Sequence, residues 1–230
     1  MKEIIKMTKK EILVFVLMSV LSGIMIGIGG TASLTALDTL GKWGKLIGSL
    51  LFSLGIFAIV TYEMRLFTGM VADIPKMGMR NTWKLPICFL GNILGVAVVA
   101  LLVYFTPFSD AVIRQSQIIA ANKLGAENWA LSALCSSILC GALITLSVWS
   151  VKYSPRKGLD ATLGVTFPIV VFAFCGFDHS VANVLYFYFN GVWSWQIIGY
   201  EALCVLGNIL GGIILPLVHL VREYSKKRDV

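Results

Sequence analysis

The hexapeptide Leu-Gly-Asn-Ile-Leu-Gly occurs twice in this chain, at residues 90–95 and again, 116 residues later, at 206–211. Its glycines stand four positions apart, a spacing that lets membrane helices approach closely, so each copy predicts a helix-packing face. The offset is half of the 230-residue chain, and apolar stretches start at nearly the same offset, 12 with 128, 46 with 161 and 85 with 202. We therefore interpret the chain as one domain, 1–230, built from two related halves at about 11–110 and 127–222.

The amino-acid composition is that of a membrane protein. Hydrophobic residues make up 57% of the chain and charged residues 13%, against about 25% charged residues in soluble domains. A soluble domain of this length has too little interior to bury so much apolar surface. The net charge of +7 is spread over short clusters and forms no basic face interleaved with aromatic residues, which excludes nucleic-acid binding. The composition therefore predicts an integral membrane protein.

Seven stretches lack Asp, Glu, Lys and Arg: 12–37, 46–62, 85–109, 128–151, 161–177, 180–200 and 202–221. Four of them have the roughly 20 apolar residues that a spanning helix needs, and two are shorter because charged residues interrupt them. The turn signal Asn190-Gly191 predicts that the fifth span ends there and that a loop follows. The first stretch is too long for a cleaved signal peptide. We expect six transmembrane helices in an all-α fold.

The positively charged residues predict the orientation. With six spans both termini lie on one side of the membrane, and that side receives fourteen Lys and Arg residues against four on the other. Cytoplasmic loops carry such an excess. We therefore expect the N-terminal segment 1–10 and the tail 223–230 to be cytoplasmic.

The second span of each half is interrupted at the corresponding place. The first break lies around 63–69 and the second around 176–180. Because each half has an odd number of spans, the second half enters the membrane from the opposite side, which predicts an inverted repeat with broken second and fifth helices. Paired breaks in such repeats mark transport pathways, and the helix starts that follow them favour anions. The breaks therefore predict a pathway for an anionic or polar solute between the halves.

Polar residues at the breaks are candidates for the chemistry of that pathway. His179 titrates near neutral pH in its ordinary state and lies in the second break, so we expect it to be functional rather than a satisfied structural histidine. Thr68 occupies the matching break, where its hydroxyl bonds a solute or His179, or caps the next helix. Asn183 is expected to face the pathway or to satisfy freed backbone groups. Arg65 and Asp178 have opposite charges, and we consider a pairing across the two breaks.

Apolar residues on the flanking half-helices are candidates for constrictions, because apolar side chains gate pores by dewetting. They are Phe52, Ile56, Leu66 and Phe172. By composition alone, contact with the core or with lipid is the better explanation of them. The five cysteines lie in apolar surroundings without a Cys-x-x-Cys motif, so we expect neither a disulfide framework nor a metal site.

Five motifs follow one another along the chain: Phe52-Ser53-Leu54-Gly55, Leu66-Phe67-Thr68-Gly69, Leu90-Gly91-Asn92, 176–183 and Gly207-Asn208-Ile209-Leu210-Gly211. Over nearly the whole chain, these motifs resemble those of the formate/nitrite transporter family. The resemblance implies an aquaporin-like fold with six spans, a homopentamer with one pore per protomer in the plasma membrane, and transport of small monovalent anions or their conjugate acids, such as formate, nitrite or hydrosulfide. It assigns His179 and Thr68 to the pore centre and the four apolar residues to its constrictions. The supporting break residues are Arg65, Phe67, Gly69, Asp178 and Asn183.

Three positions depart from the family pattern. Arg65 stands where an acidic residue usually precedes Leu-Phe-Thr, and Gly141 stands where the fourth span usually carries an asparagine. Gly125 matches the place of a typical lysine, with Lys123 two residues away. All three changes concern the electrostatics around the site.

The leading functional hypothesis is a channel for a small monovalent weak-acid anion, which crosses after protonation by, or through, His179. The alternative is an aquaporin-like channel for a small neutral solute, although the paired Asn-Pro-Ala motifs of aquaporins do not occur here. A membrane enzyme is the third class, and the chain lacks the cofactor ligands or the nucleophile–base set that it requires. We therefore expect neither catalysis nor a cofactor.

Overall fold

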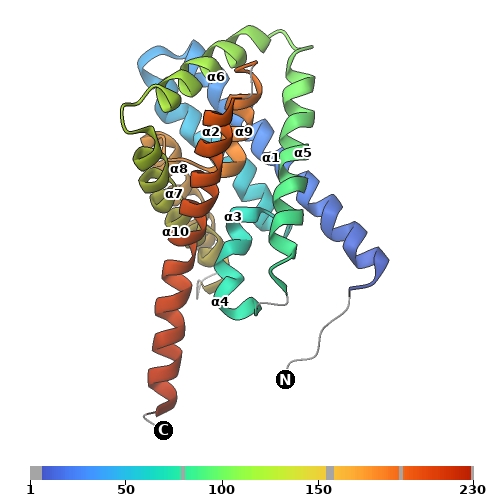
Figure 1. The fold of residues 1–230 in the computed structure, drawn as a ribbon, viewed down its shortest axis with the longest axis vertical. Coiled ribbons are helices and arrows are strands. Elements are labelled where there is room, and N and C mark those ends of the chain that lie inside the picture. Colours follow the sequence, from blue (N-terminus) through green and yellow to red (C-terminus); the bar gives the residue numbers. More distant parts are fainter. Residues whose placement is uncertain (1–6, 79–80, 154–157, 192–193, 229–230) are drawn as a thin grey trace.

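The computed structural model describes residues 7–78, 81–153, 158–191 and 194–228, and helices form the regular structure of these residues (Figure 1). The short 3-10 helices are η1 (Gly41–Trp43) and η2 (Val71–Asp73). The α-helices are α1 (Lys9–Thr39), α2 (Gly44–Thr61), α3 (Phe67–Met70), α4 (Ile74–Met77), α5 (Lys84–Val103), α6 (Ser109–Leu124), α7 (Trp129–Tyr153), α8 (Leu159–Cys175), α9 (Ser180–Tyr188) and α10 (Trp195–Arg228).

Five helices of the described residues are long and apolar enough to cross a membrane: α1, α2 together with η1, α5, α7 and α10. Helices α8 and α9 meet at a bend of 46° and make a sixth span when they are counted as one. In the first half, α2 ends at Thr61 and α3 begins at Phe67. The all-α membrane fold is therefore confirmed, and the chain is interrupted between α2 and α3 and between α8 and α9.

The sixth span begins earlier than the sequence suggested. Helix α10 starts at Trp195 rather than at 202. The Ser194 hydroxyl accepts a hydrogen bond from the backbone N–H of Ile197 at 3.3 Å, which starts the helix there. Glu201 is charged and so marks the predicted boundary of this span, yet it lies inside α10 with its carboxyl oxygens buried.

The first helix also extends beyond its predicted limits. Of the predicted cytoplasmic segment 1–10, residues 1–6 lie outside the described part of the chain, and Lys9 and Lys10 belong to α1. A capping box fixes this start, because Thr8 and Glu11 bond each other's backbone N–H groups.

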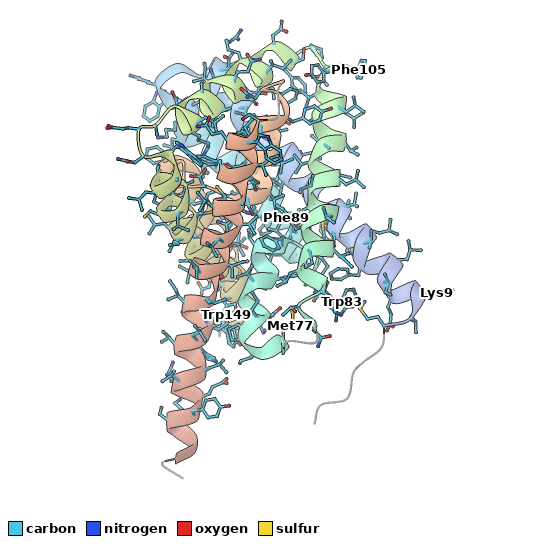
Figure 2. All side chains as sticks on the ribbon, in the orientation of Figure 1. Lys9, Met77, Trp83, Phe89, Phe105 and Trp149 are labelled. Atoms are coloured by element: carbon cyan, nitrogen blue, oxygen red, sulfur yellow. The ribbon has the colours of Figure 1, made fainter. Side chains whose placement is uncertain are left out.

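The two described ends of the chain lie at the same end of the molecule (Figure 1). Lys9 at the start of α1, Met77 and Trp83 all lie toward this end, whereas Phe105 lies at the opposite one (Figure 2). Helix α6 crosses that opposite end of the bundle (Figure 1). Its Arg114 makes two hydrogen bonds to the carboxylate of Asp38 on α1, and this pairing raises the pKa of the Arg114 guanidinium.

The glycines of the repeated hexapeptide pack helices, as their spacing predicted. A Cβ at Gly91 would meet the Cβ of Ser19 on α1 at 2.6 Å, and one at Gly207 would meet the Cβ of Ser137 on α7 at 2.5 Å. Gly95 and Gly211 lie equally close to backbone carbonyl oxygens of the same two partner helices. The pairs α1–α5 and α7–α10 therefore pack in the same way.

Candidate pore site

His179 is held at the start of α9 by the shape of the second break. Helix α8 ends at Gly176, whose left-handed φ of 78° suits glycine. The chain is then extended through His179, whose Nδ1 accepts a hydrogen bond from the backbone N–H of Ala182 at 3.1 Å. The imidazole therefore serves as the N-cap of α9.

This capping bond determines the tautomer of His179. Because Nδ1 accepts a hydrogen bond, the proton of the neutral ring resides on Nε2. Nε2 lies 3.0 Å from Oγ1 of Thr68, the second residue of α3, so the ring donates to the hydroxyl. Both residues are buried, and their side chains join the two breaks, which are 111 residues apart in sequence.

The asparagines at the centre of the repeated hexapeptide hold the two breaks in place. Oδ1 of Asn92 accepts from the Phe67 N–H at 2.8 Å, and its Nδ2 donates to the carbonyls of Ser19 and Arg65. Asn92 therefore supplies the partners that the broken backbone has lost.

Asn208 makes the same three bonds in the second half. Its Oδ1 accepts from the Ser180 N–H at 2.9 Å, and its Nδ2 donates to the carbonyls of Ser137 and Asp178. The repeated hexapeptide predicted a role for its glycines in helix packing but none for its asparagine. The identical asparagine in both copies was the signal that could have identified these residues.

Asp178 is paired with Lys123 of α6, not with Arg65 as considered from the sequence. Nδ2 of Asn183 and the Tyr200 hydroxyl also donate to its carboxylate, at 3.2 and 3.1 Å. The side chain of Arg65 is exposed in a separate cavity. The pairing of Asp178 with Arg65 is therefore wrong, because the path of α6 brings Lys123 to Asp178 from 55 residues away in sequence.

The two remaining departures from the family pattern are explained by packing. Gly125 is the C-cap of α6, and the cation that reaches the site comes from Lys123 instead. Gly141 of α7 lies against the backbone of Asn208, where any side chain would collide. Gly141 therefore lets α7 and α10 come together and carries no polar group toward the pore.

The four apolar candidates are buried beside His179 and Thr68. The rings of Phe52 and Phe172 meet edge to face with centroids 5.5 Å apart, and Phe172 stacks on the His179 ring at 5.7 Å. Ile56 is fully buried in α2, and Leu66 directly precedes α3. Apolar side chains thus surround the single histidine–threonine hydrogen bond.

Two cavities approach this centre from opposite ends of the bundle. One, of about 440 Å³, opens beside α6. The other, of about 430 Å³, lies toward the end that holds the chain termini. The first is lined by residues that include Phe52, Phe172, His179, Lys45, Lys123 and Asn183. The second is lined by residues that include Leu66, Gly69, Glu63, Arg65, Asp73 and Lys152.

The chain is similar to bacterial transport proteins. It is 27% identical over 231 residues to the Bacillus subtilis protein named uncharacterized transporter YrhG, with 91% of this chain and 85% of that protein covered. It is 28% identical over 206 residues to formate channel FocA of Haemophilus influenzae, with 75% and 72% covered.

Solved structures share the fold. A pentameric formate channel with formate bound superposes with a TM-score of 0.77 at 22% identity, over 97% of this chain and 100% of that one. An FNT family ion channel superposes with a TM-score of 0.78 at 24% identity, over 94% and 91%. A family model described as formate/nitrite transporter matches residues 1–221. Since that match covers nearly the whole chain, the protein belongs to the formate/nitrite transporter family.

Proposed function

We propose that the protein conducts a small monovalent weak-acid anion, such as formate, nitrite or hydrosulfide, between the two cavities. The observation that carries this proposal is the hydrogen bond between His179 and Thr68, enclosed by apolar side chains and flanked by a cavity on each side. The family membership and the relatives named as formate channels support an anion as the solute.

The charges of the cavities and the polarity of the centre favour different forms of the solute. Lys45 and Lys123 line the α6-side cavity, which favours entry of anions there. In the other cavity Arg65 and Lys152 are balanced by Glu63 and Asp73. A bare anion between Phe52, Phe172 and Leu66 would lose its hydration without gaining a countercharge, which is costly. We therefore infer that the solute enters as an anion and crosses the constrictions as the neutral acid.

In this mechanism His179 is a hydrogen-bond donor to the solute. Its Nε2–H and the Thr68 hydroxyl offer the polar contact between the constrictions. Protonation of Nδ1 would break the hydrogen bond that Nδ1 accepts from the Ala182 N–H. The geometry thus favours a permanently neutral ring, and the solute receives its proton in a cavity rather than from His179.

We further propose that the protein forms a pentamer in the plasma membrane with cytoplasmic termini. A structural relative is described as a pentameric formate channel. The basic residues gathered on the side of the termini support the orientation. Native mass spectrometry in mild detergent should give five copies, and a monodisperse monomer or trimer would contradict this assembly.

A flux panel in proteoliposomes tests the function. Formate, nitrite, hydrosulfide, acetate, chloride and glycerol are compared at two pH values, with protein-free vesicles as the control. At least one weak-acid anion should permeate faster at the lower pH, and chloride should not permeate. Permeation by glycerol together with failure of every anion would favour the neutral-solute channel instead.

A further inference from the structure

Glu201 is a carboxylic acid within the membrane-spanning part of α10. Both of its carboxyl oxygens are inaccessible to solvent, and neither has a hydrogen-bond partner among the described residues. A carboxylate in such a place would lose its hydration with nothing in exchange, which is among the most costly arrangements in a protein.

A second buried atom without a partner among the described residues belongs to Asn183 of α9. Its Nδ2 donates to Asp178 at 3.2 Å and to Sγ of Cys204 at 3.3 Å, which leaves Oδ1 unsatisfied. Cys204 lies one helical turn after Glu201, and the Asn183 side chain neighbours the Glu201 carboxyl. Oδ1 of Asn183 and an ionised Glu201 are both acceptors, so a single proton between them would satisfy both groups.

The neighbouring charges also oppose a second ionised carboxyl group. The titratable groups that face Glu201 are Asp178 from the break, Lys123 from α6, and Tyr200 and Cys204 from α10 itself. The one cation of this set, Lys123, pairs with Asp178, and the Tyr200 hydroxyl donates to Asp178 as well. Asp178 therefore holds the negative charge of the cluster. Glu201 has no cation of its own, and the one donor beside it, Nδ2 of Asn183, already bonds Asp178.

We propose that Glu201 is protonated and that its hydroxyl donates a hydrogen bond to Oδ1 of Asn183. This bond fixes the orientation of the amide, so that Nδ2 faces Asp178 in the cluster that lines the α6-side cavity together with Lys123. Glu201 is thus a positioning residue that acts through Asn183. The link to transport rests on the proposed function, whereas the protonation state does not.

Infrared spectroscopy of the purified full-length protein tests the protonation state. The C=O stretch of a protonated carboxyl group is separate from the carboxylate bands and shifts in D₂O. Glu201→Gln should remove one such band at neutral pH. Glu127→Gln, at an exposed glutamate, is the matched control and should remove only a carboxylate signal. Loss of a carboxylate signal alone in Glu201→Gln would overturn the proposal.

Formate flux in proteoliposomes tests the positioning role. Gln offers an N–H donor to Asn183 in nearly the same shape as protonated Glu, whereas Leu fills the space without a donor. Glu201→Leu should lower flux by roughly fivefold or more, since a buried acceptor loses its partner, and Glu201→Gln should retain clearly more flux than Leu. Equal formate flux through Glu201→Leu and Glu201→Gln would overturn this role.

The two readouts separate failure of this inference from failure of the proposed function. Absence of flux in the wild type would refute weak-acid transport and leave the infrared result intact. Gel filtration shows that each variant assembles before it is compared, and if Glu201→Leu does not assemble, the infrared difference of Glu201→Gln decides the question.

Discussion

At the scale of single residues, the proposed pore centre depends on one imidazole that performs two tasks. Nδ1 of His179 caps α9, and Nε2 faces Thr68 across the interface between the halves. One ring nitrogen is thereby committed to structure, and the other is available to a solute. This division argues for a neutral hydrogen-bonding histidine.

Substitution of His179 should separate hydrogen bonding from titration. His179→Phe should lower weak-acid flux by roughly tenfold or more, because an unpaired polar group between apolar side chains costs about 1–3 kcal/mol. His179→Asn keeps a donor and a good N-cap, so it should retain part of the flux with the pH dependence of the wild type. Flux against pH is the measurement, with His219→Asn as the control. A changed pH dependence in His179→Asn would instead indicate proton transfer by the ring.

The two asparagines that hold the breaks, Asn92 and Asn208, should contribute strongly to the stability of the fold. Asn208→Leu leaves the Ser180 N–H and the carbonyls of Ser137 and Asp178 without their partner. Each unsatisfied buried group costs about 1–3 kcal/mol, so the thermal unfolding midpoint in detergent should fall markedly. The exposed Asn122→Leu, inside α6, is the control and should leave the midpoint nearly unchanged. Equal midpoints for the two variants would show that the break is held by other contacts.

At the scale of elements, two equivalent helix pairs frame the proposed pore. Helices α1 and α5 carry the first break between them, and α7 and α10 carry the second, each pair joined at glycines and by one asparagine. Helix α6 then closes one end and delivers Lys123 to Asp178. The short elements α3 and α9 are thus positioned by longer helices around them.

The close contact between the paired helices should be essential for assembly of the protein in both halves. A Cβ at Gly95 or Gly211 would overlap a backbone carbonyl of the partner helix. Overpacking of this kind costs about 1–3 kcal/mol or more, so Gly95→Val and Gly211→Val should each reduce the yield of assembled protein on gel filtration. Leu94→Val and Leu210→Val, on the exposed side of the same helices, serve as controls. Normal assembly of both glycine variants would exclude a requirement for close approach.

At the scale of the whole molecule, the arrangement of the helices determines the topology. The start of α1 and the end of α10 lie at the same end of the molecule (Figure 1). Together with the positive residues near that end, this geometry predicts cytoplasmic termini. A reporter that works only in the cytoplasm should be active when it is fused to the C-terminus. A reporter that works only outside the cytoplasm should be active when it is fused after Phe105, which lies at the other end (Figure 2). The reverse pattern would contradict the predicted orientation.

The sequence by itself determined the features that depend on local chemistry. Long apolar stretches identified a membrane protein, charges and a glycine marked the two interrupted helices, and the repeated hexapeptide predicted helix packing. These properties are carried by neighbouring residues, because hydrophobic transfer and turn formation act within a few positions of the chain.

Only the tertiary structure decided which polar groups meet. The bonds of Asn92 and Asn208 to the breaks, the pairing of Lys123 with Asp178, and the helical burial of Glu201 were not predicted. The pairing of Lys123 with Asp178 joins residues 55 positions apart, and Thr68 meets His179 across 111. A charged residue looks like the end of a span in the sequence, but a folded bundle can bury it once other helices supply the surroundings. The partners of a buried polar group depend on helix packing, and for that reason they cannot be read from local sequence.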